Sequence, residues 1–96
     1  MRRADALQII ASHEPELRAM GVRSLAIFGS VARDQAVPGS DVDLLVEFDR
    51  PVGYFHVFDV QDRLEAFLGC KVDLVTRGGL RPEIREGVLA EAVRAA

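Results

Sequence analysis

Two aspartates separated by one residue, Asp41 and Asp43, follow a Gly29-Ser30 pair after a spacer of ten residues. Apolar runs directly before the glycine and directly after the second aspartate predict buried strands at both ends of this motif. Side chains alternate along a strand, so the two carboxylates point to one face with their backbones roughly 6.6 Å apart. They can therefore hold the same ions.

A metal site is the chemistry that such a pair suggests. Two carboxylates this close repel each other, and a bound divalent cation is the simplest compensation. Oxygen-only ligands favour magnesium or manganese over zinc.

A third acid, Asp73, is the lone charge inside the apolar segment Val72-Asp73-Leu74-Val75. If this segment is a strand beside that of Asp43, its carboxylate completes the cluster; otherwise it is an edge charge that discourages aggregation. Three acids around two metals about 3.5 to 4 Å apart fit an in-line displacement at phosphorus. The predicted reaction class is phosphoryl or nucleotidyl transfer.

The glycine-serine end of the motif suits a phosphate. Gly29 allows close backbone approach, and the Ser30 hydroxyl and the next amides can donate to phosphate oxygens. Arg33, one helical turn further, could neutralise triphosphate charge or instead brace a carboxylate. Ser40 directly precedes the first aspartate, where it could cap or orient the metal-binding strand, and we group it with the nucleotide-binding residues.

The elements that must position these residues follow from hydrophobic spacing. Helices are predicted at residues 4–12, in a short segment ending near Met20, at 55–68 and from Pro82 onward. Strands are predicted at 24–28, 42–48 and 72–75, the second pairing with the first. The long helix is expected to pack one apolar stripe on the sheet, made of Phe55, Phe58, Leu64, Phe67 and Leu68. The last helix is expected to bury a similar stripe, made of Ile84, Val88, Leu89 and Val93.

Bulk properties indicate one small domain, residues 1–96, with a compact core. Apolar residues make up 49% of the chain and charged residues 28%, a globular balance. Eleven arginines and one lysine leave a net charge of −3, so no broad nucleic-acid face is expected. The absence of a long apolar run or a secretory signal predicts a cytoplasmic protein without membrane contact.

Gly29-Ser30, ten residues, and Asp41-Val42-Asp43 resemble the signature of the DNA polymerase β-type nucleotidyltransferases. With Lys71-Val72-Asp73-Leu74-Val75 further along, the chain resembles in particular the minimal nucleotidyltransferases, small proteins often called MNT antitoxins. The resemblance covers about residues 4 to 93. It implies an α/β fold: a minimal nucleotidyltransferase palm, in which a small mixed sheet of three to four strands is flanked by about four helices.

The resemblance also implies roles for the motif residues. Asp41 and Asp43 would ligate two magnesium ions, Asp73 would be the third ligand and a candidate base, and Gly29 and Ser30 would hold the triphosphate of ATP. The family's usual partner is a helical HEPN ribonuclease toxin, to whose tyrosine such proteins transfer AMP. A hetero-oligomer with the toxin is therefore expected. A tyrosine hydroxyl, with a pKa near 10, needs help to lose its proton.

Two other functions stay open on the sequence. The chain could neutralise a toxin by binding alone, with the nucleotide site secondary. It could instead transfer a nucleotide to a small molecule or an RNA end, although its length leaves little beyond the catalytic sheet to recognise one.

Overall fold

A four-stranded mixed sheet organises the protein in this computed structural model, which describes residues 1–37 and 39–96. The Pro38-Gly39 pair predicts a turn before the second strand, but Pro38 lies outside the described residues. The strand order is β3-β2-β1-β4. Strand β1 pairs antiparallel with β2 and β4, whereas β3 runs parallel to β2. The strands are β1 (Val22–Phe28), β2 (Val42–Phe48), β3 (Val72–Thr76) and β4 (Val93–Arg94).

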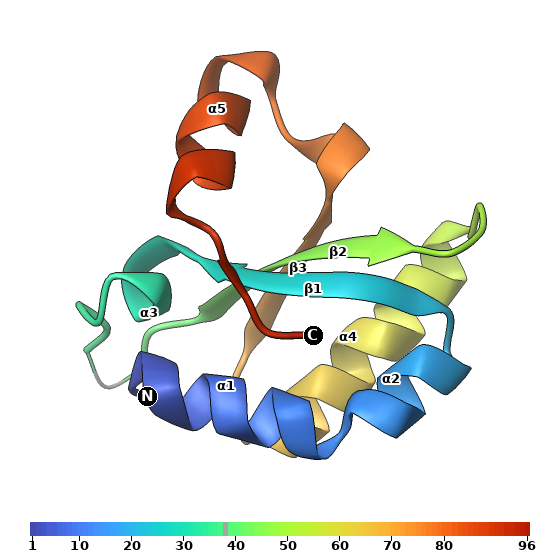
Figure 1. The fold of residues 1–96 in the computed structure, drawn as a ribbon, viewed down its shortest axis with the longest axis horizontal. Helices are drawn as coiled ribbons and strands as arrows, with labels where there is room; N and C mark the ends of the chain where they lie inside the picture. Colours follow the sequence, from blue (N-terminus) through green and yellow to red (C-terminus); the bar gives the residue numbers. More distant parts are fainter. Residues whose placement is uncertain (38) are drawn as a thin grey trace.

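Helices cover the two faces of the sheet unequally. Three helices, α1 (Arg3–Ser12), α2 (Glu14–Ala19) and α4 (Tyr54–Leu68), lie on one side, and α5 (Pro82–Glu91) stands on the other (Figure 1). The one-turn α3 (Gly29–Ala32) follows β1, and a 3-10 turn, η1 (Arg77–Gly79), connects β3 to α5. The predicted α/β fold with a small mixed sheet is confirmed.

The core lies between the sheet and its three-helix side. Alternate strand residues are buried there, including Leu25 and Ile27 of β1 and Leu44 of β2, because side chains of a strand alternate between faces. They pack with Ile10 of α1 and Leu64 of α4 in one cluster. The opposite face therefore carries the intervening residues, Asp43 and Asp73 among them.

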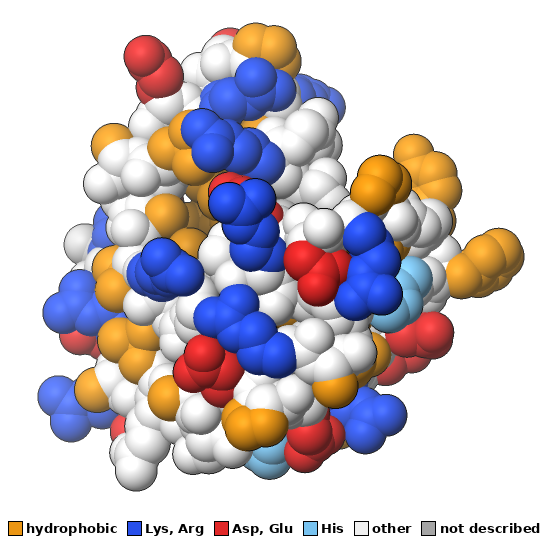
Figure 2. Space-filling model, turned by 45° about the vertical axis from the view of Figure 1, so that its right-hand side comes forward, with side chains coloured by type: hydrophobic (Ala, Val, Ile, Leu, Met, Phe, Trp, Pro, Cys, Tyr) orange, Lys and Arg blue, Asp and Glu red, His pale blue; other side chains and the backbone are white. Residues whose placement is uncertain are grey.

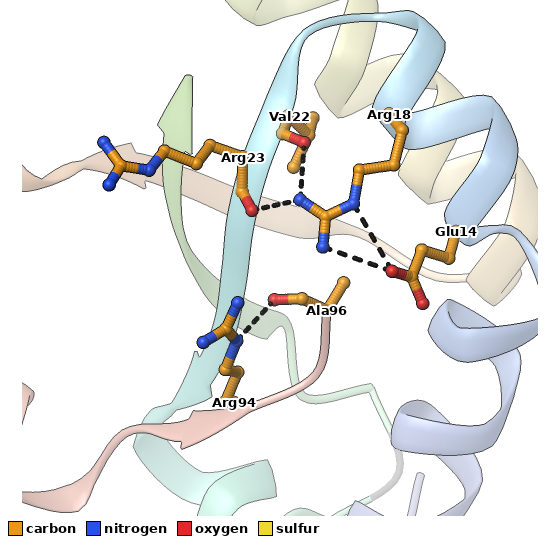
Figure 3. Close-up of polar contacts among 6 residues, drawn as sticks. All are labelled: Glu14, Arg18, Val22, Arg23, Arg94 and Ala96. Carbon is orange, nitrogen blue, oxygen red and sulfur yellow. Dashed lines mark hydrogen bonds and ion pairs between the residues drawn. The ribbon is translucent and has the colours of Figure 1, made fainter. Parts of the chain in front are cut away.

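The junction between α2 and β1 is held by one arginine. The register between β1 and β2 shifts between Val22 and Ser24. Arg18 reaches this irregularity, where its guanidinium donates to the carbonyl oxygens of Val22 and Arg23 and pairs with Glu14 at 3.1 Å (Figure 3). These bonds satisfy carbonyls at the irregular start of the strand.

The predicted apolar stripe of α4 is wrong at its first turns. Phe55 is 87% exposed and Phe58 55% exposed, whereas Val60 and Leu64 are fully buried. At 3.6 residues per turn, Phe55 lies about 180° around the helix from Leu64, so the two cannot share a face. The buried stripe continues at Leu68 and leaves the early aromatic residues in solvent.

The predicted end and burial of the last helix are also wrong. Helix α5 ends at Glu91, and Val93 belongs to β4, which pairs with Ile27 of β1. None of the residues of α5, all of which the structure describes, is buried, and Ile84 is 49% exposed. An extended backbone at Ala92 lets the chain return as an edge strand.

The surface has two features that the overall composition conceals. Hydrophobic side chains project at the right of Figure 2, and the exposed aromatics of α4 are Tyr54, Phe55 and Phe58. Lys and Arg side chains gather in a band down the middle of the same view, although the net charge is −3. Among the described helices, none has the length and hydropathy to cross a bilayer.

Candidate active site

The turn after β1 lies directly against Asp43. Phe28, the last residue of β1, is the register partner of Asp43 in β2. Gly29 then takes a left-handed backbone with φ +73°, and a Cβ atom at this position would overlap the Asp43 carboxylate. Only glycine, which has no Cβ, can adopt this left-handed backbone without strain and also fit beside the carboxylate. The predicted phosphate-binding turn and the predicted metal ligand thus meet at one point.

Parallel pairing of β2 and β3 brings the second acid alongside. Asp43 and Asp73 are register partners, so their side chains leave the same face from backbones about 4.8 Å apart. Asp41 immediately precedes β2, and both it and Asp73 are exposed, whereas Asp43 is half-buried. The three acids singled out from the sequence therefore lie along one edge of the open sheet face.

The surroundings of Asp43 disfavour its charge. Burial raises the pKa of this carboxyl above its ordinary value of 3.8, and the negative charges of Asp73, Asp41 and Glu91 raise it further. Arg33 opposes these effects. A cation among these carboxylates would relieve the repulsion.

The donor set fits a hard divalent cation. All three candidate ligands are carboxylates, which magnesium prefers. Within residues 1–37 and 39–96, no three His, Cys, Asp or Glu side chains already converge at metal-binding distance. Exposed side chains change rotamer readily, so Asp41 and Asp73 can turn towards Asp43 when a cation binds.

The serines of the motif lie in different settings. Ser30 occupies the first turn of α3, next to the glycine that approaches Asp43. The Ser40 hydroxyl accepts a hydrogen bond from the Val37 amide at 3.1 Å, and the Ser40 amide donates back to the Val37 carbonyl. This reciprocal pair closes the loop before Asp41, which favours the orienting role considered for Ser40.

Arg33 already has a carboxylate partner. Its Nη1 donates to Glu91 Oε2 at 2.8 Å, and its Nε donates to Gln35 at 3.0 Å. The other oxygen of Glu91 accepts from the Gly29 amide at 2.9 Å. These bonds hold the pKa of Glu91 below its usual range. The alternative in which Arg33 braces a carboxylate is therefore what the structure contains.

Sequence reasoning missed Glu91 because it lies 58 positions from Arg33 and in no motif. It also missed a cavity of about 300 Å³ beside Asp41. This cavity brings the chain's one lysine close to the acidic edge, where it offers a positive charge to an anionic ligand. Its lining residues are Met1, Val37, Gly39, Ser40, Asp41, Cys70 and Lys71.

Comparison with known proteins identifies the family of this chain. A family model for the nucleotidyltransferase domain matches residues 10–95. The chain belongs to the nucleotidyltransferase family. The protein adenylyltransferase MntA of Thermococcus cleftensis is 41% identical over 86 residues, which are 88% of this chain and 87% of that protein.

Solved structures of this family share the fold. One provisionally described as a minimal nucleotidyltransferase has a TM-score of 0.83 and 34% identity, covering 97% of this chain and 95% of its own. Two more distant ones show the fold alone. A toxin-antitoxin with AMP-PNP has a TM-score of 0.76 and 18% identity, covering 91% and 72%. The MNT antitoxin complex with the tri-AMPylated Shewanella oneidensis HEPN toxin has a TM-score of 0.69 and 16% identity, covering 95% and 71%.

Replacing Gly29 by alanine tests the close approach of the turn to Asp43. The left-handed backbone alone should cost about 1 to 2 kcal/mol in free energy of unfolding, and the overlap with Asp43 should add to that cost. Urea denaturation measures it. Gly87→Ala is the matched control, since a Cβ at this helical position meets open space. Equal stability of the two variants would contradict the close approach.

Replacing Asp43 by asparagine tests the carboxylate repulsion. Because its folded-state pKa is raised, the folded protein binds more protons than the unfolded one just above pH 3.8, and stability falls as pH rises through that window. At neutral pH without divalent ions, Asp43→Asn should therefore melt at a higher temperature than the unaltered protein. The difference should shrink in acid, and magnesium should stabilise the unaltered protein more than the variant.

The exposed Asp59, replaced by asparagine, is the control for the loss of one negative charge. A lower melting temperature for Asp43→Asn than for this control, in chelator at neutral pH, would show that Asp43 is not under repulsion.

Proposed function

We propose that this nucleotidyltransferase uses divalent metal to transfer AMP from ATP to a tyrosine of a HEPN-type toxin, and so acts as its antitoxin. The observation that carries the proposal is the meeting of Gly29 with Asp43, with Asp73 in register beside it. A turn suited to phosphate and an acidic edge suited to a cation are thereby adjacent, as nucleotidyl transfer requires.

Each residue has a distinct part in this proposal. The turn at Gly29-Ser30 holds triphosphate oxygens through backbone amides and the serine hydroxyl. Asp41, Asp43 and Asp73 would hold magnesium, which would stabilise negative charge on the reacting phosphate.

The acceptor hydroxyl oxygen attacks the α-phosphorus, and the bond from that phosphorus to the oxygen bridging to the β-phosphorus breaks. Pyrophosphate leaves with the electron pair of that bond. The hydroxyl proton passes to Asp73, which lies at the exposed side of the cluster and can act as general base.

Two observations favour a protein over a small molecule as the acceptor: the names of the related proteins and the exposed surface of α4 and α5. The related MntA is named a protein adenylyltransferase, and a structural neighbour is an antitoxin bound to an AMPylated HEPN toxin. This chain exposes Tyr54 and Phe55 at 83% and 87% and buries no residue of α5. Exposed aromatic residues are typical of protein interfaces.

The same aromatic surface favours a second candidate function, in which the chain neutralises the toxin by binding alone. In that case the carboxylates would be dispensable for protection. RNA as acceptor is a further outcome to test, since Lys and Arg side chains gather in a band on one face (Figure 2).

Mass spectrometry decides between these functions. A HEPN-type toxin, incubated with this chain, ATP and magnesium, should gain the mass of one or more AMP units on a tyrosine. The double variant Asp41→Asn/Asp43→Asn should transfer at least a hundredfold less, since it removes two candidate metal ligands. Asp5→Asn/Glu16→Gln, which changes two exposed acids of α1 and α2, is the matched control and should transfer normally.

Two results would overturn the proposal. The first is no AMP on the partner while the partner still binds tightly and the Asp41/Asp43 variant still protects cells; this supports neutralisation by binding. The second is radiolabel from ATP in RNA instead of protein.

A further inference from the structure

The Glu91 carboxylate lies where the proposed function places phosphate. One oxygen accepts from the Gly29 amide at 2.9 Å and the other from Arg33 Nη1 at 2.8 Å. A backbone amide at a turn and an arginine are the donors that a phosphate group attracts. The C-terminal helix thus supplies an anion to the turn predicted to hold the triphosphate.

This occupancy competes with a nucleotide. The Gly29 amide has one hydrogen, so a phosphate oxygen that accepts it must replace Glu91. The charges also favour replacement of Glu91 by a nucleotide. Glu91 neutralises Arg33, a positive charge near the aspartates, and its own negative charge adds to the repulsion on Asp43. A triphosphate gains Arg33 as a partner when Glu91 leaves.

Helix α5 is weakly packed, so it can release the contact of Glu91 with the turn. None of its residues, all described, is buried, and the preceding η1 contains Gly78 and Gly79. Figure 1 shows α5 standing away from the sheet, between η1 and the return into β4. The two bonds of Glu91 tie the last turn of α5 to the turn at Gly29, while the chain beyond it is held separately by the pairing of β4 with β1 from Val93 onward.

We propose that Glu91 is a built-in occupant of the phosphate site that nucleotide must displace, which couples nucleotide binding to release of α5. The inference rests on the proposed nucleotide site. Because coupling between two equilibria is reciprocal, a protein partner that holds α5 in the released position would raise the affinity for nucleotide. The partner would thereby favour loading of the enzyme that modifies it.

Calorimetric titration tests the displacement. The probe is an ATP analogue with a methylene bridge between the α- and β-phosphorus, added with magnesium to the full chain. Glu91→Ala should lower its Kd by about tenfold, the typical value of a hydrogen bond to a charged group. Glu91→Gln, which can still accept from Gly29 but loses the ion pair, should give a smaller decrease. Glu86→Ala, an exposed acid of the same helix, should leave Kd unchanged.

Hydrogen exchange on the unaltered chain provides a readout that no substitution can disturb. Amides of α5 should exchange several times faster when the analogue is bound. Unchanged or slower exchange in α5, or a higher Kd for Glu91→Ala, would overturn the inference and leave Glu91 as a residue that positions Arg33. If the unaltered chain binds no analogue, the proposed nucleotide site itself fails.

Discussion

The approach of Gly29 to Asp43 is the constraint on which the rest of the site depends. It requires β1 to end at Phe28, opposite Asp43, and it requires a residue with no side chain and a left-handed backbone. Once this contact exists, the first turn of α3 begins directly beside Asp43. Helix α5 lies beside this edge through Glu91, whereas the exposed aromatic residues of α4 follow the other end of β2 (Figure 1).

One face of the sheet packs into the core, and the other carries the candidate catalytic carboxylates. Leu25, Ile27 and Leu44 pack against α1, α2 and α4 on one face, and the carboxylates alternate with such residues on the other. Parallel pairing of β2 with β3 places Asp43 against Asp73, a repulsion that no packing argument would select. Such local conflict with stability is typical of functional sites, and here it creates a place for a cation.

Short-range patterns predicted strands β1 to β3 and the ends of α1, α2 and α4 to within about two residues, because these depend on neighbours in sequence. Gly21 and Gly69 end their helices with left-handed backbones, as glycines commonly do. The exposure of Phe55 contradicts the predicted stripe, and helical periodicity counted from Val60 and Leu64, which define the buried face, accounts for it. The ion pair of Arg33 with Glu91 and the short strand β4 could not be predicted, because both depend on where a distant segment docks.

We propose that Asp41, Asp43 and Asp73 hold divalent metal beside a triphosphate on the Gly29-Ser30 turn. A crystal structure with manganese and an ATP analogue that resists cleavage at the α-phosphorus tests it most directly, since manganese is located by its anomalous scattering. The expected result is metal between the three carboxylates, phosphate oxygens on the turn, and Glu91 displaced. Metal bound elsewhere, or a nucleotide whose phosphates lie away from the turn, would contradict it.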